Sequence, residues 1–448
     1  MKFIHLDEAR RAALEKLDSI LAEQPAGTRA VLVDDFFGEL RLALWGGAEV
    51  DIEALRERIS ADLSACAGTI WSGVVWLGRD DATPADKIVL DSAWKDGREI
   101  NSRLRVLDRV RNRTAWFDPP RQPPWPAPSE VNDGSELSPP VVAFCSFKGG
   151  VGRTTALAAF ALARARLGER VAVVDFDLDA PGAGKLLDAT SDGPRWGVVD
   201  YLLERARGEV PLVDYLGIAR AEASGLIEVM PAGDVNDDYL SKLARLDLEL
   251  PQGPSHPFEM LLEDLRRKRK PDWILVDTRS GLSAAAGIVL SGIAHLYVAF
   301  ATSSSQSQVG LQRIAKRIGA DRLQCEPAIP QAPLLVVHAM VPEDVRAAVD
   351  VEDEFSANLE DILTDQYFLK AGGDPDDRFW SLDDRDTTDG PHHPVPIPYN
   401  AALATFPSLS AVALMLTEAI PYQRLSSRIA NLLPRLPRPT GDDEESTS

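Results

Sequence analysis

The chain has 448 residues, of which 45% are hydrophobic and 26% are charged, and its formal net charge is −21. This composition excludes an intrinsically disordered chain, and the length suffices for two or three domains. The acidic balance argues against a protein that coats nucleic acid or anionic membrane. The three cysteines lie far apart in the sequence, which indicates a reducing, cytoplasmic location and not a disulfide framework.

Residues 1–118 are expected to form a small α/β domain. Helical periodicity covers residues 6–23, 52–65 and 87–94, and strand-like runs cover residues 29–33 and 70–77. The basic segment 103–113 is either a solvated face, which we favour, or a contact for an acidic partner or nucleic acid. No catalytic constellation is evident, so this domain is interpreted as an interaction or sensory module.

Residues 119–140 hold eight of the 32 prolines and are predicted to form an extended, semi-rigid linker. Beyond it, strand-like runs cover residues 141–146, 170–175, 226–230, 273–276, 295–300, 334–338 and 395–397. Their alternation with helical segments predicts an α/β fold for residues 141–438, with a mostly parallel sheet covered by helices on both faces. Residues 439–448 are expected to be an acidic, disordered tail.

One uncharged segment, residues 283–302, imitates a membrane span. It is rich in alanine and glycine, and His295 interrupts it, so we predict a buried helix followed by a buried strand.

The most informative segment is Phe-Cys-Ser-Phe-Lys-Gly-Gly-Val-Gly-Arg-Thr-Thr, residues 144–155. An apolar strand leads into a glycine-rich turn, and a helix follows it. Glycines let the backbone curl around an anion, and the helix N-terminus adds free N–H donors and a favourable dipole. The hydroxyl of Thr154 is placed to bind Mg²⁺. The pattern predicts a phosphate-binding loop for a nucleotide.

Three blocks together resemble the MinD/ParA family of P-loop ATPases, whose deviant phosphate loop reads KGGxGK[ST]. The blocks are KGGVGRTT at 148–155, VVDFDLDAPG at 173–182 and DWILVDTRSG at 272–281. The resemblance implies an ATP–Mg²⁺ site and an ATP-dependent homodimer in which Lys148 reaches the partner's phosphates. The residues that it assigns to nucleotide binding are Gly149, Gly150, Val151, Gly152, Arg153, Thr154, Thr155 and Pro398.

The same resemblance assigns roles to three aspartates that follow or end predicted strands. Asp177 would orient the attacking water, Asp175 would support the Mg²⁺ shell, and Asp277 would bind Mg²⁺ through water. Carboxylates at the carboxyl ends of parallel strands meet beside the phosphate loop, which makes these roles physically reasonable. Asp179 is more simply a turn residue, and Arg279 has two equal interpretations, a phosphate contact or a structural ion pair.

The chain departs from the family pattern at Arg153, which replaces the usual lysine of the phosphate loop. A guanidinium is longer, planar and forked, so nucleotide binding should survive better than hydrolysis. With Lys148, Asp177 and Arg153 as the catalytic set, we predict a slow ATPase. The adenine pocket is poorly marked: His338 is interpreted as structural, and the segment around Pro398 resembles a loop that closes on the base.

Two further segments have either a partner-binding role or a structural role. The basic run 266–270 either contacts a phosphate backbone or stabilises a helix C-terminus, and the helical pattern at 422–433 either binds a partner or membrane or packs on the sheet. The structural alternative is favoured for both, so DNA and membrane are not favoured partners.

The leading hypothesis is an ATPase whose nucleotide-dependent dimer controls a partner in a partition, localisation, signalling or defence system. The alternatives are a non-hydrolysing ATP sensor or scaffold, motivated by Arg153, and an ATP-dependent ligase of the dethiobiotin-synthetase type.

Overall fold

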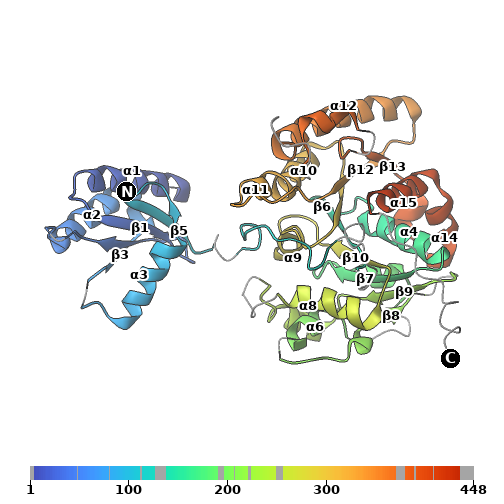
Figure 1. The fold of residues 1–448 in the computed structure, drawn as a ribbon, viewed down its shortest axis with the longest axis horizontal. Coiled ribbons are helices and arrows are strands. Elements are labelled where there is room, and N and C mark those ends of the chain that lie inside the picture. The colour runs from blue at the N-terminus through green and yellow to red at the C-terminus, as the bar shows by residue number, and fades with distance from the viewer. Residues whose placement is uncertain are drawn as a thin grey trace, which may run out of the picture. The chain divides into compact units, whose positions relative to one another are not determined.

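The computed structural model describes residues 5–47, 49–79, 81–110, 114–126, 138–189, 196–205, 207–219, 223–248, 256–369, 379–387, 390–406 and 408–433. The chain divides into two compact units, Met1–Asp118 and Pro119–Ser448, which are described separately (Figure 1). The expected tail at 439–448 lies outside the described residues.

The first unit is a five-stranded mixed sheet with the order β3-β2-β1-β5-β4. Its strands are β1 (Arg29–Asp34), β2 (Leu40–Trp45), β3 (Trp71–Leu77), β4 (Arg98–Glu99) and β5 (Leu104–Asp108). Its helices are α1 (Leu6–Ala22), α2 (Ile52–Ala67) and α3 (Pro84–Asp96), and a short 3-10 turn, η1 (Gly68–Ile70), follows α2. Helices α1 and α2 pack on one face of the sheet, and α3 packs on the other.

The basic segment at 103–113 differs from the solvated face that we favoured. Its described part contains β5, which pairs in parallel with β1 near the middle of the sheet. Leu104 and Val106 are buried, and Arg103 donates to the carbonyls of Leu21 and Gln24. Arg105 lies between the buried Leu104 and Val106 and donates to the carbonyl of Trp94, and this charged residue concealed the apolar pattern of the strand.

The second unit is an eight-stranded sheet with the order β13-β12-β11-β6-β10-β7-β9-β8, parallel except for the β8–β9 pair. Its strands are β6 (Val141–Ser146), β7 (Arg170–Phe176), β8 (Gly217–Ile218), β9 (Leu226–Met230), β10 (Trp273–Thr278), β11 (Leu296–Ala301), β12 (Leu334–Val341) and β13 (Val395–Pro398). The central strands β6, β10 and β11 are buried along their whole length, as expected for a sheet covered on both faces.

Helices cover both faces of this sheet (Figure 1). They are α4 (Arg153–Arg166), α5 (Ala183–Leu186), α6 (Val198–Arg205), α7 (Asp237–Leu243), α8 (Pro257–Asp264), α9 (Ala284–Val289), α10 (Ser305–Ile318), α11 (Ala320–Leu323), α12 (Val345–Gln366), α13 (Ala401–Thr405), α14 (Leu409–Glu418) and α15 (Ile420–Leu432). Short helical turns are η4 (Leu212–Tyr215), η5 (Leu265–Arg269) and η6 (Leu382–Asp386). Tyr422, Leu425 and Ile429 of α15 join the core that α4 and α14 form on the sheet, so the packing alternative holds for this helix.

The proline-rich segment 119–140 differs in part from an extended linker. Trp125 is buried within the second unit, and its indole N–H donates to the carbonyl of Pro139 at 2.8 Å. Residues 127–137 lie outside the described residues. The uncharged segment 283–302 contains α9 and then β11, which are both buried, as predicted.

Candidate functional site

The site begins where β6 ends, at the turn between Ser146 and Arg153. Gly150 and Gly152 adopt left-handed backbone angles, with φ of +72° and +81°, which other residues adopt only with strain. Gly152 caps α4, a helix of 14 residues whose first residue is Arg153. A strand, a curled glycine turn and a helix N-terminus therefore form the anion cradle that the sequence predicts.

Three carboxylates converge beside this turn. Asp175 of β7 and Asp277 of β10 are neighbours across the sheet, and Asp177 follows β7 directly. All three side chains are buried. Since β10 lies between β6 and β7, the carboxyl ends of these strands bring the acids to the phosphate loop.

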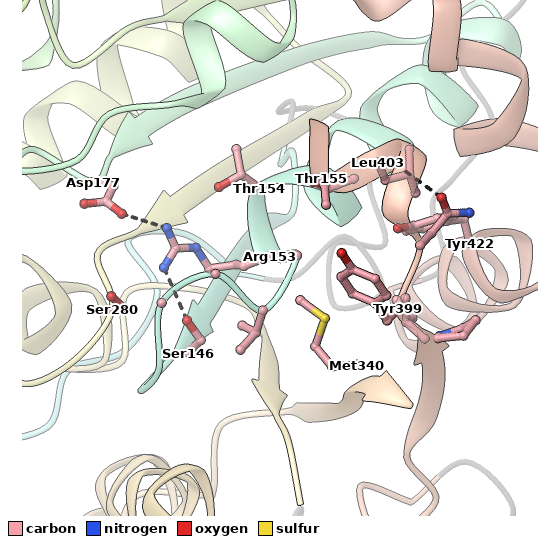
Figure 2. A pocket seen from close by; sticks show the side chains of 18 of the residues that line it. Ser146, Arg153, Thr154, Thr155, Asp177, Ser280, Met340, Tyr399, Leu403 and Tyr422 are labelled. Carbon is pink, nitrogen blue, oxygen red and sulfur yellow. Dashed lines mark hydrogen bonds and ion pairs between the residues drawn. The ribbon is translucent and has the colours of Figure 1, made fainter. Parts of the chain in front are cut away.

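Arg153 does not extend into the open part of the site but binds two of these acids. Its Nε lies 2.6 Å from Oδ1 of Asp277, and its Nη2 lies 2.9 Å from Oδ2 of Asp177. Its Nη1 also donates to the hydroxyl of Ser146 at 3.4 Å. Figure 2 shows the guanidinium directed toward Asp177 and Ser146, away from Tyr399. Burial lowers the pKa of Arg153, but the carboxylates of Asp277 and Asp177 reverse this effect and raise the pKa.

Thr154 completes this buried network. Its hydroxyl donates to Oδ2 of Asp277 at 2.6 Å, so both oxygens of Asp277 accept hydrogen bonds. Burial raises the pKa of Asp277, while Arg153 and Thr154 oppose that shift. Hydroxyl and carboxylate oxygens are ligands that suit Mg²⁺, and Thr154 and Asp277 are close enough to share one ion. Arg153 donates to Oδ1 of Asp277, and Oδ2 is the oxygen next to Thr154. A metal ion on Oδ2 and the guanidinium on Oδ1 would therefore compete for the negative charge of this carboxylate.

Asp175 is engaged differently from the metal role that the resemblance implies. Its Oδ2 accepts from the backbone N–H groups of Gly182 and Ala183, both at 3.0 Å, and its Oδ1 accepts from the N–H of Asp177 at 3.3 Å. Burial and the nearby carboxylates of Asp277 and Asp177 raise the pKa of Asp175 to about 8. The side chain holds the loop after β7 in place. In the described part of the chain, no group of three or more His, Cys, Asp or Glu could hold a metal ion.

A cavity of about 470 Å³ contains the phosphate loop and continues toward an aromatic end. Residues 149–155, Asp177 and Pro398 line it, as the sequence predicts. Lys148, Asp175 and Asp277 do not line it, and the side chain of Lys148 is exposed. The loop residues of the predicted site are thus brought together, whereas Lys148 faces solvent.

The far end of the cavity contains residues that sequence analysis missed. These are Met340, Tyr399, Leu403 and Tyr422, which Figure 2 shows on the side of Arg153 opposite to Asp177. Tyr399 was adjacent to the predicted Pro398, but Met340 and Tyr422 reach the cavity only through the fold. Asn400 also lines it, yet its Oδ1 accepts from the N–H groups of Ala402 and Leu403 and caps α13.

Other residues considered from sequence have structural roles. Arg279 pairs with Asp179 at 2.9 Å and with Asp177 at 3.6 Å, which is the ion-pair interpretation. His338 stacks on Phe355 with 3.9 Å between ring centroids and does not line the nucleotide cavity.

The basic run 266–270 is largely paired with acids, which supports its structural interpretation. Arg266 and Arg267 bind Glu263, Lys268 binds Asp264, and Arg269 binds Glu228.

The parallel sheet, the glycine turn before a helix and the acids on neighbouring strands define a P-loop nucleotide-binding domain. Residues 142–361 match the family model described as the CobQ/CobB/MinD/ParA nucleotide binding domain. This part of the chain is a MinD/ParA-like nucleotide-binding domain. No helix among the described residues combines the length and the apolar character that a membrane crossing requires.

Three of the solved structures that match this chain are described by the extent of each match. A putative plasmid partition protein from Borrelia burgdorferi B31 bound to AMPPNP is 15% identical, with 66% of this chain and 98% of that chain covered and a TM-score of 0.41. MinD from Pyrococcus horikoshii complexed with Mg-ADP is 17% identical, with 65% and 95% covered and a TM-score of 0.40. The MinC:MinD complex from Aquifex aeolicus gives 18% identity, 67% and 98% coverage and a TM-score of 0.40. Comparison of the sequence with curated proteins gives no match.

Proposed function

We propose that this chain is a cytoplasmic, nucleotide-switched ATPase that converts ATP and water to ADP and phosphate slowly. The observation that carries the proposal is that the glycine cradle at 149–152, the start of α4 and Asp177 line one cavity, and that Asp277 is bound to Arg153 and Thr154 of its wall. The cavity also has an aromatic end with Tyr399 and Tyr422, which suits a nucleotide base.

The buried network specifies what each side chain would do. Thr154 and Asp277 would hold Mg²⁺, which supplies charge stabilisation on the phosphate oxygens when bound. Asp177 would accept a hydrogen bond from the attacking water and orient it. Arg153 now binds Asp177 and Asp277, so it has to turn from these acids to the phosphates before turnover. Breaking a buried ion pair is costly, which is the physical reason to expect a slow reaction.

Lys148 is exposed at the rim of the phosphate loop, where a second copy of the chain would be able to approach it. By resemblance to the family, ATP would stabilise a homodimer, and residues 1–118 would couple that state to a protein partner. DNA and membrane are not proposed as partners.

A second candidate function is favoured by the same arginine. Because Arg153 neutralises both Asp177 and Asp277, the site is also suited to bind nucleotide without hydrolysing it, as a sensor or scaffold. The ligase alternative has no specific observation in its favour among the described residues and is not proposed.

The discriminating experiment compares wild type with Asp177→Ala in two assays, ATP turnover and nucleotide binding. For an ATPase, turnover falls by about 10²-fold or more in the variant while binding persists, as expected when a group that orients water is removed. If wild type binds ATP–Mg²⁺ without releasing phosphate, also in the presence of its partner, the sensor function replaces the ATPase. Light scattering with and without ATP–Mg²⁺ tests the dimer, and an unchanged mass contradicts it.

A further inference from the structure

A second cavity, of about 490 Å³, lies within the second unit at the amino ends of β11 and β12. Three stretches line it: residues 122–126 of the proline-rich segment, Ala294 and His295 before β11, and residues 329–333 before β12. Arg322 of α11 completes its wall. This edge of the sheet is opposite to the one that carries the phosphate loop, which follows the carboxyl end of β6.

Arg322 is a buried cation without a carboxylate partner among the described residues. Its side chain is 4% exposed, and its Nε and Nη1 donate at 2.6 Å to the carbonyls of Pro330 and Arg121. The third nitrogen, Nη2, makes no hydrogen bond to any residue that the structure describes. Burial lowers the pKa of Arg322, and no carboxylate acts on it in the opposite direction. A buried charge without a counter-charge is costly, so this site gains much from an anion.

The other polar groups of the cavity add no second charge. The N–H of Val141 donates to Nδ1 of His295 at 2.9 Å, so the imidazole proton lies on Nε2, which is 2.9 Å from the carbonyl of Trp125. His295 is therefore neutral. The amide of Gln331 donates to the carbonyls of Tyr367 and Trp380 and accepts from the N–H of Trp380.

The remaining wall is apolar. Trp125 and the prolines on both sides of the cavity contribute ring surface, and the prolines have no N–H to offer a polar ligand. A cavity with one cation and apolar walls suits a ligand that has one negative charge and an otherwise apolar structure. A polyphosphate would bring several charges that a single guanidinium does not balance.

We propose that this second cavity binds a small organic carboxylate, with Arg322 as the partner of the carboxylate and Trp125 and the prolines around its apolar body. The proposal concerns a site separate from the nucleotide cavity and does not depend on hydrolysis. A guanidinium is the side chain best suited to a carboxylate because its planar donors match the two oxygens.

The test uses the full chain with excess ADP–Mg²⁺, so that the nucleotide site is occupied, and 4-phenylbutyrate as the probe. A ligand of this size is expected to bind with a Kd on the order of millimolar. Binding is compared by calorimetry or saturation-transfer NMR with the neutral amide of the same acid and with phenyl phosphate. We expect the carboxylate to bind about tenfold or more tightly than the amide, and more tightly than the phosphate.

Variants at two positions test whether the carboxylate binds in the second cavity. Gln122→Glu places a negative charge on an exposed residue of the cavity wall and should weaken carboxylate binding about tenfold, with little change for the amide. Gln122→Met is the matched neutral control and should bind like wild type. Arg322→Gln removes the cation and should abolish the preference for the carboxylate, but it also loses two backbone contacts, so Gln122→Glu keeps the test independent of folding.

Several results would overturn the proposal. These are equal binding of the carboxylate and the amide, tighter binding of phenyl phosphate, carboxylate binding that Gln122→Glu leaves unchanged, or no saturable binding of the carboxylate at millimolar concentration. Since excess ADP–Mg²⁺ is present throughout and ATP is absent, none of these results depends on whether the chain hydrolyses ATP.

Discussion

Arg153 and Asp277 form a buried ion pair in which Nε lies 2.6 Å from Oδ1, and this pair holds the arginine away from the nucleotide cavity's aromatic end. The same guanidinium also binds Asp177, so one side chain neutralises both acids that an ATPase of this kind would use. The guanidinium is thus a cation on Oδ1 of Asp277, next to Oδ2, the oxygen that the proposed Mg²⁺ would share with Thr154. The first two predictions follow from this relationship.

Arg153→Lys should increase ATP turnover by about tenfold or more, which corresponds to about 1.4 kcal/mol of activation free energy. A lysine offers one compact ammonium and cannot bridge Asp177 and Asp277 as the forked guanidinium does. Phosphate release under saturating ATP–Mg²⁺ measures the effect, with Arg424→Lys on the exposed face of α15 as the control. A turnover equal to or below that of wild type would show that the pairing of Arg153 does not limit the reaction.

Arg153→Met should destabilise the protein by about 3–5 kcal/mol in the absence of Mg²⁺, because it leaves the buried Asp277 without its cation and Asp177 with only Arg279, among the described cations, at 3.6 Å. Added Mg²⁺ should restore much of this loss in the variant, since the ion can then replace the guanidinium beside Asp277 and Thr154. Thermal unfolding with Mg²⁺ and with a chelator measures both effects. The interpretation fails if Mg²⁺ raises the Tm of the variant no more than that of wild type.

Gly292→Ala should lower the free energy of unfolding, because other groups of the chain lie very close to Gly292. Its φ is +120°, and an added Cβ would collide with the carbonyl oxygen of Arg121 and with Nη1 of Arg322. We expect a loss of more than about 2 kcal/mol, since a steric clash adds to the backbone strain. Gly168→Ala, at a φ of +85° with only an ordinary contact nearby, is the matched control and should lose about 1–2 kcal/mol. Equal losses of unfolding free energy, measured in denaturant, would mean that the close approach does not matter.

The buried imidazole of His338 should make the free energy of unfolding depend on pH. Burial lowers its pKa from 6.5 to about 4, so the folded state keeps the imidazole neutral where the unfolded chain is already protonated. This residue therefore costs no stability above pH 6.5, and its destabilising effect grows as the pH falls from about 6.5 to about 4. The slope is at most about 1.4 kcal/mol per pH unit.

The measurement is the difference in unfolding free energy between pH 7 and pH 5.5, compared for wild type and His338→Gln. The variant lacks the titrating group, so its loss between the two pH values should be smaller. The two losses would be equal if His338 were accessible to protons in the folded state.

Much of the second unit was predictable because its signals are local. The apolar runs of β6 and β9 were assigned with the bounds that the structure has, and the glycines of KGGVGRTT between a strand and a helix mark the phosphate loop. Strand β5 was missed because its short apolar run is interrupted by Arg105 and lies in an arginine-rich segment, which in a single sequence looks like a charged surface.

The parts of the site that were missed depend on the fold and not on local pattern. Met340 and Tyr422 come to the cavity from β12 and α15, and nothing in the neighbouring residues distinguishes them from ordinary core positions. The orientation of Arg153 was likewise outside the reach of the sequence. A longer side chain in the phosphate loop can point to phosphate or to the acids, and only the positions of Asp177 and Asp277 decide between these directions.

Strand β6 runs between the two cavities of the second unit, from the amino ends of the parallel strands to their carboxyl ends. Its first residue, Val141, is hydrogen-bonded to His295 of the second cavity, and its last, Ser146, accepts from Arg153. The six residues from Val141 to Ser146 span about 17 Å, and β10 and β11 hold them on both sides. A fully extended strand cannot stretch. Val141 and Ser146 therefore keep a fixed separation, so β6 sets the distance between the two cavities.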